Sequence, residues 1–208
     1  MEGRSISSAV IKRLPRYYRY LQELEEEQIE RISSEELSRR MSVTASQIRQ
    51  DLNNFGGFGQ QGYGYNVEYL KTEIGKILGL DRTHGLIIVG AGNLGKALCG
   101  YMSKDDRFRT RGIFDADPEV VGRKVRDLTV QPIDGLEDFL KETEVEIAIL
   151  AIPKTEAQEL TDRLIACGIR AIWNFSHVDL TVPKDVYVEN VNLIESLMTL
   201  SFRLNEAR

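Results

Sequence analysis

The stretch IIVGAGNLGKAL, residues Ile87–Leu98, decides the fold of the C-terminal part of the chain. An apolar run typical of a buried strand leads directly into the pattern Gly-x-Gly-x-x-Gly, and helix-forming residues follow. The first glycine permits a tight turn, the second lets a pyrophosphate approach the backbone, and the third lets helix and strand pack closely. The glycine turn is therefore predicted to bind a dinucleotide through Gly90, Ala91, Gly92, Asn93, Leu94 and Gly95. A glycine turn without a ligand is the alternative.

An acidic residue at the end of the next predicted strand indicates which dinucleotide is bound. Asp115 lies in RGIFDAD, residues 111–117, where a carboxylate accepts hydrogen bonds from the adenosine ribose hydroxyls. Because this charge repels a 2′-phosphate, we expect NADH and NAD+ as ligands. Asp117 either shares this role or caps a helix that begins at Pro118.

From Leu86 onward, apolar strands alternate with helical segments. This order is typical of a parallel sheet covered by helices on both faces, so we predict an α/β Rossmann-fold domain over residues 83–190. Its strands are expected at residues 86–90, 111–117, 145–153, 169–175 and 185–191. An amphipathic helix over residues 191–208 follows, with an apolar stripe from Leu193 to Leu204.

The first 82 residues have a different pattern, which predicts a small helical domain. Apolar spacing indicates a long helix over residues 5–30, in which Pro15 causes either a kink or a late start. Capping pairs predict two short helices, one from Ser33 to Met41 and one from Thr44 to about Asn53. Together they form a candidate helix-turn-helix, which a fourth helix over residues 67–80 closes.

A glycine-rich segment, FGGFGQQGYGY, joins the third and fourth helices. Its aromatic side chains are unusual for a linker. A flexible linker is nevertheless the alternative. We predict a hairpin that turns at its glycines, which is the wing of a winged-helix domain.

Polar and basic side chains of the first 82 residues are predicted to contact DNA. Arg and Gln side chains on the third helix can read base edges in the major groove, and basic residues of the first helix and wing residues can hold phosphates. The predicted contacts are Arg13, Arg16, Ser46, Gln47, Arg49, Gln50, Gln60, Gln61 and Tyr63. A polar face exposed only to solvent is the alternative.

Composition limits the class of protein. The 208 residues are 42% hydrophobic and 28% charged, as in soluble globular proteins, and no apolar run is long enough for a membrane span. We therefore expect a cytoplasmic protein without membrane contact. The net charge of −5 argues against general polyanion binding, although residues 1–22 form a basic region. Cys99 and Cys167 are interpreted as core residues.

We predict neither catalytic residues nor a metal site. His84 and His177 are expected in loops, and no residues have metal-ligand spacing. Only one helix is predicted after the last strand, so we expect no substrate domain that would complete a dehydrogenase cleft.

The chain resembles the Rex family of redox-sensing transcriptional repressors over nearly its whole length. The resemblance rests on RLPRYYRYLQEL, SSEELSRRMSVTASQIRQDLNNFGGFGQQGYGY, IIVGAGNLGKAL, GIFDADP, AIPKTEAQ and VENVNLIESL. It implies a homodimer that binds palindromic double-stranded operator DNA when NADH is low and leaves it when NADH rises. It also implies that the C-terminal helix is exchanged between subunits.

The resemblance further implies roles for single residues. Tyr101 and Arg19 would couple the two domains together with an acid at the start of the last helix, where this sequence has Asn192. Asn174 and Phe175 would contact the nicotinamide, and Tyr101 would also belong to the cofactor-binding residues.

Two other functions are alternatives. One is a small oxidoreductase with a regulatory domain. The other is a coenzyme A regulator, because residues 148–176 are similar to the coenzyme A binding domain of succinyl-CoA ligase. Asp115 argues against the second function, since a 3′-phosphorylated nucleotide gains nothing from an acid suited to free ribose hydroxyls.

Overall fold

The computed structural model describes residues 6–60 and 63–206, with the side chain of Gln60 also left out. The chain divides into two compact units, Met1–Arg82 and Thr83–Arg208. Each unit has its own hydrophobic core.

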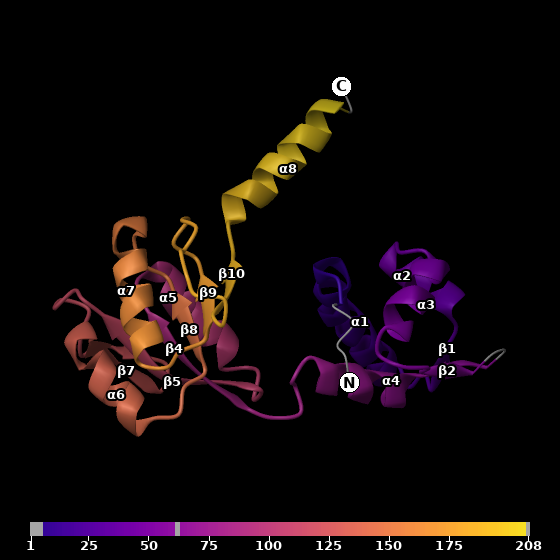
Figure 1. Cartoon of the computed structure of the whole chain (residues 1–208), viewed down its shortest axis with the longest axis horizontal. Coiled ribbons are helices and arrows are strands. Elements are labelled where there is room, and N and C mark those ends of the chain that lie inside the picture. Colours follow the sequence, from indigo (N-terminus) through magenta and orange to yellow (C-terminus); the bar gives the residue numbers. More distant parts are fainter. Residues whose placement is uncertain (1–5, 61–62, 207–208) are drawn as a thin grey trace. The chain divides into compact units, whose positions relative to one another are not determined.

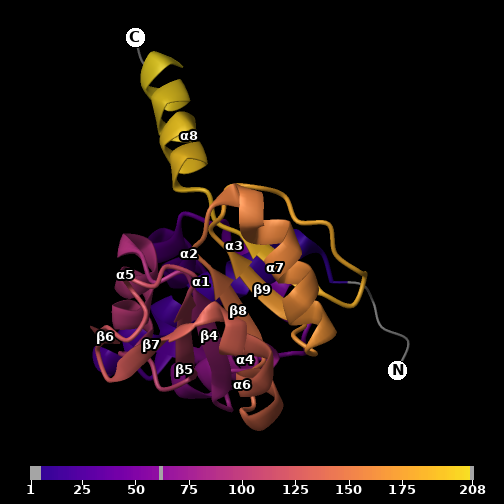
Figure 2. The ribbon, with the colours of Figure 1, turned by 90° about the vertical axis from the view of Figure 1, so that its left-hand side faces the viewer.

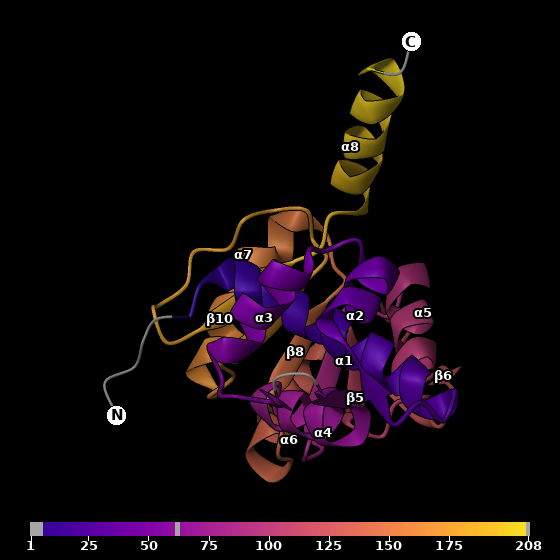
Figure 3. The same cartoon turned by 90° about the vertical axis from the view of Figure 1, so that its right-hand side faces the viewer.

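The first unit is built on four helices that begin at polar N-caps, and Figure 3 shows them in indigo to purple. The side chains of Ser7, Ser33, Thr44 and Asn66 each accept a backbone N–H from the first helical turn that they cap. The helices are α1 (Ser8–Glu26), α2 (Ser34–Met41), α3 (Ala45–Asn53) and α4 (Val67–Ile77). Their apolar faces meet in one core, whose fully buried members include Leu14, Tyr17, Leu37, Ile48 and Leu70.

Helix α1 is shorter than predicted. Pro15 lies inside it, so the late start that proline could have imposed does not occur. At the other end, Gln28 takes a φ of 61° and the chain turns away before residue 30. The turn leads into β1 (Arg31–Ile32), a strand that the sequence analysis did not predict.

The glycine-rich segment forms the predicted hairpin, with strands β2 (Gly59–Gln60) and β3 (Gly64–Asn66). Strand β1 pairs with the other side of β3, giving an antiparallel sheet in the order β1-β3-β2. A side chain at Gly64 would meet the carbonyl oxygen of Ile32 at 2.5 Å, and φ there is +68°. Tyr65 is 7% exposed and packs in the core. The hairpin is thus tied to the helices, and the flexible-linker alternative is wrong.

The second unit contains a seven-stranded sheet in the order β10-β9-β8-β4-β5-β7-β6. Its strands are β4 (His84–Val89), β5 (Phe108–Asp115), β6 (Lys124–Val125), β7 (Leu128–Pro132), β8 (Ile147–Leu150), β9 (Ala171–Asn174) and β10 (Tyr187–Asn190). Neighbouring strands are parallel except for β6, which pairs antiparallel with β7 at the edge. The sequence analysis missed this hairpin because both strands are short and half polar. It also placed His84 in a loop, whereas His84 begins β4.

Helices cover both faces of this sheet, as predicted. Side chains alternate along β4, so Leu86 and Ile88 pack with α5 (Asn93–Met102) while Ile87 and Val89 face the other layer. That layer contains α6 (Leu136–Glu142), preceded by a 3-10 turn at Ile133–Gly135, and α7 (Lys154–Ala166). Figure 2 shows α5 and α7 on opposite sides of the strands.

The last helix, α8 (Leu193–Glu206), is drawn in yellow in Figure 1. None of its residues is buried. Seven large apolar side chains on it are 52% to 63% exposed: Leu193, Ile194, Leu197, Met198, Leu200, Phe202 and Leu204. Within the described part of the chain, no helix is both long and apolar enough to cross a membrane.

Candidate functional sites

The strand order creates a crevice at the carboxyl end of β4. The chain runs from β4 through α5 to β5 on one side, and the later strand β8 pairs with β4 on the other side. In open α/β sheets, ligands bind where the strand order reverses in this way.

A cavity of about 470 Å³ lies at this position. It is formed by the turns that follow β4, β5 and β8, by the start of the 3-10 turn after β7 and by one side of α7. Its lining includes Gly90, Gly92, Asp115, Ala116, Asp117, Ile133, Ala151, Ile152, Pro153, Glu156, Glu159, Leu160 and Arg163. This volume is in the range of small-molecule pockets.

The three positions of the turn require glycine for different structural reasons. Gly90 has a φ of +99°, and a side chain there would meet the carbonyl oxygen of Ala151 at 2.3 Å. A side chain at Gly95 would meet the carbonyl oxygen of Gly90 at 1.8 Å. At Gly92, a side chain would meet no protein atom within 4 Å. Packing therefore explains Gly90 and Gly95, whereas the bare backbone of Gly92 leaves space for a ligand.

Helix α5 begins beside this space. Gly92 is its N-cap residue and supplies no side-chain hydrogen bond, while Asn93 and Leu94 in the first turn are exposed. The first backbone N–H groups of a helix have no partner within the helix, and they attract anions together with the helix dipole. The turn thus offers a place for a pyrophosphate.

Asp115 lies against the glycine turn. One carboxylate oxygen accepts the backbone N–H of Ala91 at 2.6 Å, and the other accepts the N–H of Asp117 at 2.9 Å. These bonds fix a negative charge at the end of β5 within the cavity lining.

Asp117 Oδ1 accepts the N–H of Glu119 at 2.8 Å and so shapes the segment that follows. This segment is a turn, so the predicted helix from Pro118 is wrong.

The predicted nicotinamide contacts lie outside this cavity lining. Asn174 is buried, and its side-chain NH2 donates to the carbonyl of Val178 at 2.7 Å and to Asn190 Oδ1 at 2.8 Å. Its own oxygen accepts the N–H of Ser176 at 2.9 Å. Phe175 is buried and packs edge-on against Trp173, with ring centroids 4.8 Å apart. Both side chains therefore shape the segment after β9.

The predicted coupling residues belong to different units, which the structure describes separately. Arg19 lies on α1 with its guanidinium 5.0 Å from the ring centre of Tyr20. Tyr101 lies on α5 and is 68% exposed. Asn192 Oδ1 accepts the N–H of Ile194 at 3.1 Å, so the amide that replaces the family acid caps α8.

Helix α3 presents a polar face away from the core. Ile48 and Leu52 are buried, whereas Ser46, Arg49 and Gln50 are exposed. These three predicted contacts lie on the face that a recognition helix presents to DNA.

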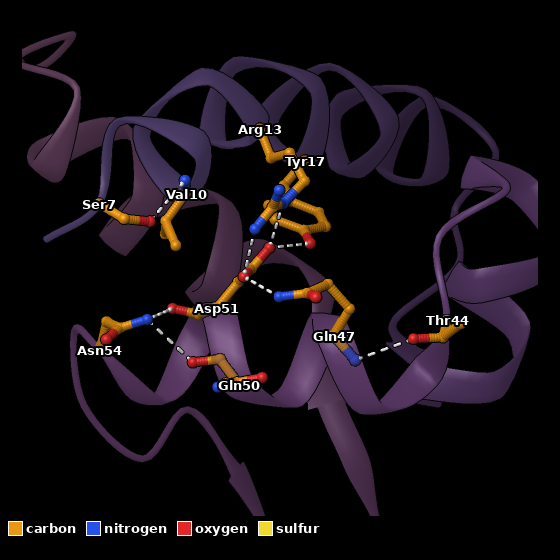
Figure 4. A network of polar contacts seen from close by, with 9 residues as sticks. All are labelled: Ser7, Val10, Arg13, Tyr17, Thr44, Gln47, Gln50, Asp51 and Asn54. Carbon is orange, nitrogen blue, oxygen red and sulfur yellow. Dashed lines mark hydrogen bonds and ion pairs between the residues drawn. The ribbon is translucent and has the colours of Figure 1, made fainter.

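A buried carboxylate on the opposite side of α3 was missed by the sequence analysis (Figure 4). Asp51 is fully buried and accepts hydrogen bonds from Arg13 at 2.6 and 2.8 Å, from Tyr17 at 2.7 Å and from Gln47 at 2.8 Å. Burial opposes the charge, but these three donors outweigh it and lower the pKa of Asp51. Its position between Ile48 and Leu52 in the sequence was the available signal.

This cluster changes the interpretation of two predicted DNA contacts. Arg13 and Gln47 direct their polar groups at Asp51, so the structure turns them inward. DNA contacts by these two side chains would have to use the polar atoms that do not bond to Asp51, or replace these hydrogen bonds.

The remaining predicted contacts lie within α1 and on the hairpin. Arg16 donates to the carbonyl of Met41 at the end of α2, at 2.6 Å. Tyr63 is 70% exposed beside the hairpin strands, and its carbonyl accepts a hydrogen bond from Arg31 at 3.2 Å. Gln61 and the side chain of Gln60 lie outside the described residues.

Two family models match the two units. Residues 5–53 match the model described as "Putative DNA-binding protein N-terminus", and residues 81–178 match the model described as "CoA binding domain". A winged-helix unit followed by a Rossmann unit with an open glycine turn defines a DNA-binding regulator that responds to a nucleotide.

The chain is similar over nearly its full length to curated proteins named redox-sensing transcriptional repressor Rex. It is 59% identical to the one from Thermoanaerobacter pseudethanolicus, covering 97% of this chain and 90% of that protein. It is 56% identical to the one from Clostridioides difficile, covering 99% of both chains. The chain belongs to the Rex family of redox-sensing transcriptional repressors.

Solved structures agree with this assignment. A crystal structure of RSP in complex with β-NAD+ and operator DNA is 57% identical, with a TM-score of 0.93 over 99% of this chain and 95% of that chain. A structure of RSP with β-NADH is 54% identical, with a TM-score of 0.89 over 99% of this chain and 97% of that chain.

Proposed function

We propose that this protein is a cytoplasmic repressor that binds palindromic operator DNA as a homodimer and is released when NADH rises relative to NAD+. The relatives support this proposal, since RSP was crystallised with operator DNA and NAD+ and, separately, with NADH. The relatives are named as repressors, so we assign no catalytic role to the chain.

The observation that carries the nucleotide part is the open space at Gly92 beside the carboxylate of Asp115. Gly90 to Gly95 would hold the pyrophosphate through backbone N–H groups, and Asp115 would accept the ribose hydroxyls in place of its bond to Ala91. The bound nucleotide would supply its redox state as a signal, through the charge on the nicotinamide ring.

The charge of the cavity favours NAD(H) over nucleotides that carry an additional phosphate on the ribose. Four acids line it, Asp115, Asp117, Glu156 and Glu159, against the single cation Arg163. Arg163 is engaged by Glu137 at 2.7 Å. An additional phosphate on the ribose, as in NADPH or coenzyme A, would meet this negative field. Despite the family model's description, the cavity therefore suits NAD(H) better than coenzyme A.

For DNA, α3 would enter the major groove and use Arg49 and Gln50 on base edges, with Ser46 on a base or phosphate. The hairpin would contact phosphate, sugar or the minor groove through Gln60, Gln61 and Tyr63. Arg16 would contribute positive charge near the backbone.

The homodimer would bury the apolar face of α8. Seven large apolar side chains exposed on a single helix indicate a missing partner surface, and a second copy supplies one through exchange of this helix. A dimer also matches the two half-sites of a palindrome.

NADH and NAD+ would bind through the same groups and differ in effect. A ligand shifts a conformational equilibrium only by its differential affinity for the two states. Moving a dimer from 99:1 to 1:99 needs about 5.5 kcal/mol, or ~2.7 kcal/mol for each of two sites. Because this coupling is reciprocal, operator DNA must weaken NADH binding by the same factor by which NADH weakens operator binding.

The test begins by selecting operator sequences from a random duplex pool with the purified protein. Labelled operator is then titrated at several ratios of NADH to NAD+, with NADPH and coenzyme A as controls. We expect NADH alone to release the DNA. An operator affinity that stays constant across all ratios would contradict redox sensing and favour the oxidoreductase alternative.

A further inference from the structure

Arg49 on the recognition helix is held by the first turn of α2. Its Nη1 donates to Ser34 Oγ at 2.6 Å and to Glu35 Oε1 at 3.0 Å. Ser34 is buried at 7% exposure, and its hydroxyl also donates to the other oxygen of Glu35 at 3.2 Å. The three side chains thus form a closed triangle, which lines a groove of about 490 Å³ between α3 and the hairpin.

The contact leaves most of the guanidinium available. Within residues 6–60 and 63–206, the hydrogen bonds of Arg49 use only Nη1. A guanidinium carries five N–H donors in a planar fork. The edge formed by Nε and Nη2 can therefore make the bidentate contact with O6 and N7 of guanine while Nη1 stays on Glu35.

Stability does not explain this ion pair. The side chains of Arg49 and Glu35 are 50% and 64% exposed, and ion pairs between exposed groups stabilise proteins little. A hydrogen bond at its own backbone and the contact with Arg49 lower the pKa of Glu35, so its carboxylate is charged at neutral pH. An arginine without such a neighbour would bind the phosphates of any sequence, because phosphate contacts carry no sequence information.

We propose that Glu35, acting with Ser34, is a specificity-determining residue that positions Arg49 for base reading and weakens its attraction to phosphates. Holding the side chain before binding lowers the entropy cost of the base contact. The nearby negative charge also penalises binding modes in which Arg49 only approaches the backbone. The proposal rests on the DNA-binding function proposed above.

The test compares Glu35→Ala with Glu68→Ala in the full-length protein. Both glutamates are exposed second residues of a helix, in α2 and α4, so the two variants lose the same charge at equivalent helix positions. Affinity is measured for the selected operator and for a scrambled duplex of equal length and composition, over a series of salt concentrations.

For Glu35→Ala we expect the ratio of operator to scrambled affinity to fall about tenfold. Binding to the scrambled duplex should become tighter, with a salt dependence steeper by about one phosphate contact. Glu68→Ala should keep the wild-type ratio. In an Arg49→Ala background, Glu35→Ala should cause no further loss of discrimination, because its effect acts through Arg49.

An unchanged ratio in Glu35→Ala would overturn the proposal, and so would an equal loss in Glu68→Ala or an undiminished loss in the Arg49→Ala background. None of these results affects the proposed function. That function is tested separately, by whether the wild-type protein binds the operator more tightly than the scrambled duplex. A wild type without discrimination would overturn both.

Discussion

The Nε of Arg13 on α1 lies 2.6 Å from the Oδ2 of Asp51 on α3, and the Asp51 carboxylate has no solvent exposure. The second oxygen of Asp51 accepts Arg13 Nη2 at 2.8 Å, so the contact is bidentate. Tyr17 and Gln47 complete the shell of donors. The recognition helix is therefore attached to α1 by a charged cluster in addition to apolar packing.

Removing the charge of Asp51 should loosen this attachment. We expect Asp51→Asn to lower the free energy of opening of α1 and α3 by about 3 kcal/mol. The variant leaves the charge of Arg13 without its partner in a largely buried position, which destabilises the two helices. The 28% of the Arg13 side chain that is exposed to solvent keeps this cost at the lower end of the range for buried ion pairs. Amide hydrogen exchange of the full-length protein measures the change. The exposed Asp81→Asn serves as the control, and equal protection in both variants would contradict the prediction.

The same carboxylate predicts an acid dependence of stability. The pKa of Asp51 is lowered in the folded protein, so its contribution is present above the unfolded pKa near ~3.9 and is lost as pH falls through the lower folded value. An acid titration followed by circular dichroism should show the helices of the first unit weakening below about pH 4 in the wild type. Asp51→Asn should lose this part of the dependence. Parallel titration curves would show that other carboxylates dominate acid unfolding.

Two glycine substitutions should separate folding from nucleotide binding. Gly95→Ala places a methyl group 1.8 Å from the carbonyl oxygen of Gly90, so we expect a strongly destabilised second unit. Gly92→Ala meets no protein atom within 4 Å and has an ordinary φ of −70°, so this variant should fold normally. Its NADH affinity, measured by calorimetry, should fall at least about tenfold, because the methyl group enters the space assigned to the pyrophosphate. Wild-type affinity in Gly92→Ala would place the pyrophosphate elsewhere.

Asp115→Ala should reduce the response to NADH and leave DNA binding without nucleotide nearly unchanged. The carboxylate is assigned to the ribose hydroxyls, and loss of one charged hydrogen-bonding group costs about 1.5 to 3 kcal/mol. The midpoint of operator release should therefore move to NADH concentrations at least about tenfold higher. Asp117→Ala is the neighbouring control, since Asp117 caps the following turn. If the midpoint of operator release moves further in Asp117→Ala than in Asp115→Ala, Asp117 and not Asp115 would be the acid that binds the ribose hydroxyls.

Assembly should depend on α8. Truncation after Asn190 removes the exposed apolar face, so we expect monomers or aggregates that fail on an operator with two half-sites. Leu197→Glu should weaken the dimer in the intact chain, whereas Thr199→Glu on the polar side of the helix should not. Sedimentation measures both variants. A truncated protein that stays a dimer and binds operator would rule out the exchanged helix.

The sequence by itself determined the features that depend on neighbouring residues. The glycine turn at Gly90, the caps at Ser33 and Thr44 and the apolar strand ending at Val89 are local arrangements of backbone and side chain, so a few adjacent residues reveal them. The hairpin was predictable for the same reason, because glycines and aromatic residues alternate along it.

Only the tertiary structure decided which polar groups face inward. Asp51 and Arg13 are 38 residues apart, and nothing adjacent to either one shows that they meet in the core. The same holds for Asn174, whose partner Asn190 belongs to a strand that pairs with β9 only after the sheet forms. Periodicity predicts which face of a helix is apolar, but the burial of a single charge depends on whether distant donors offset its loss of water.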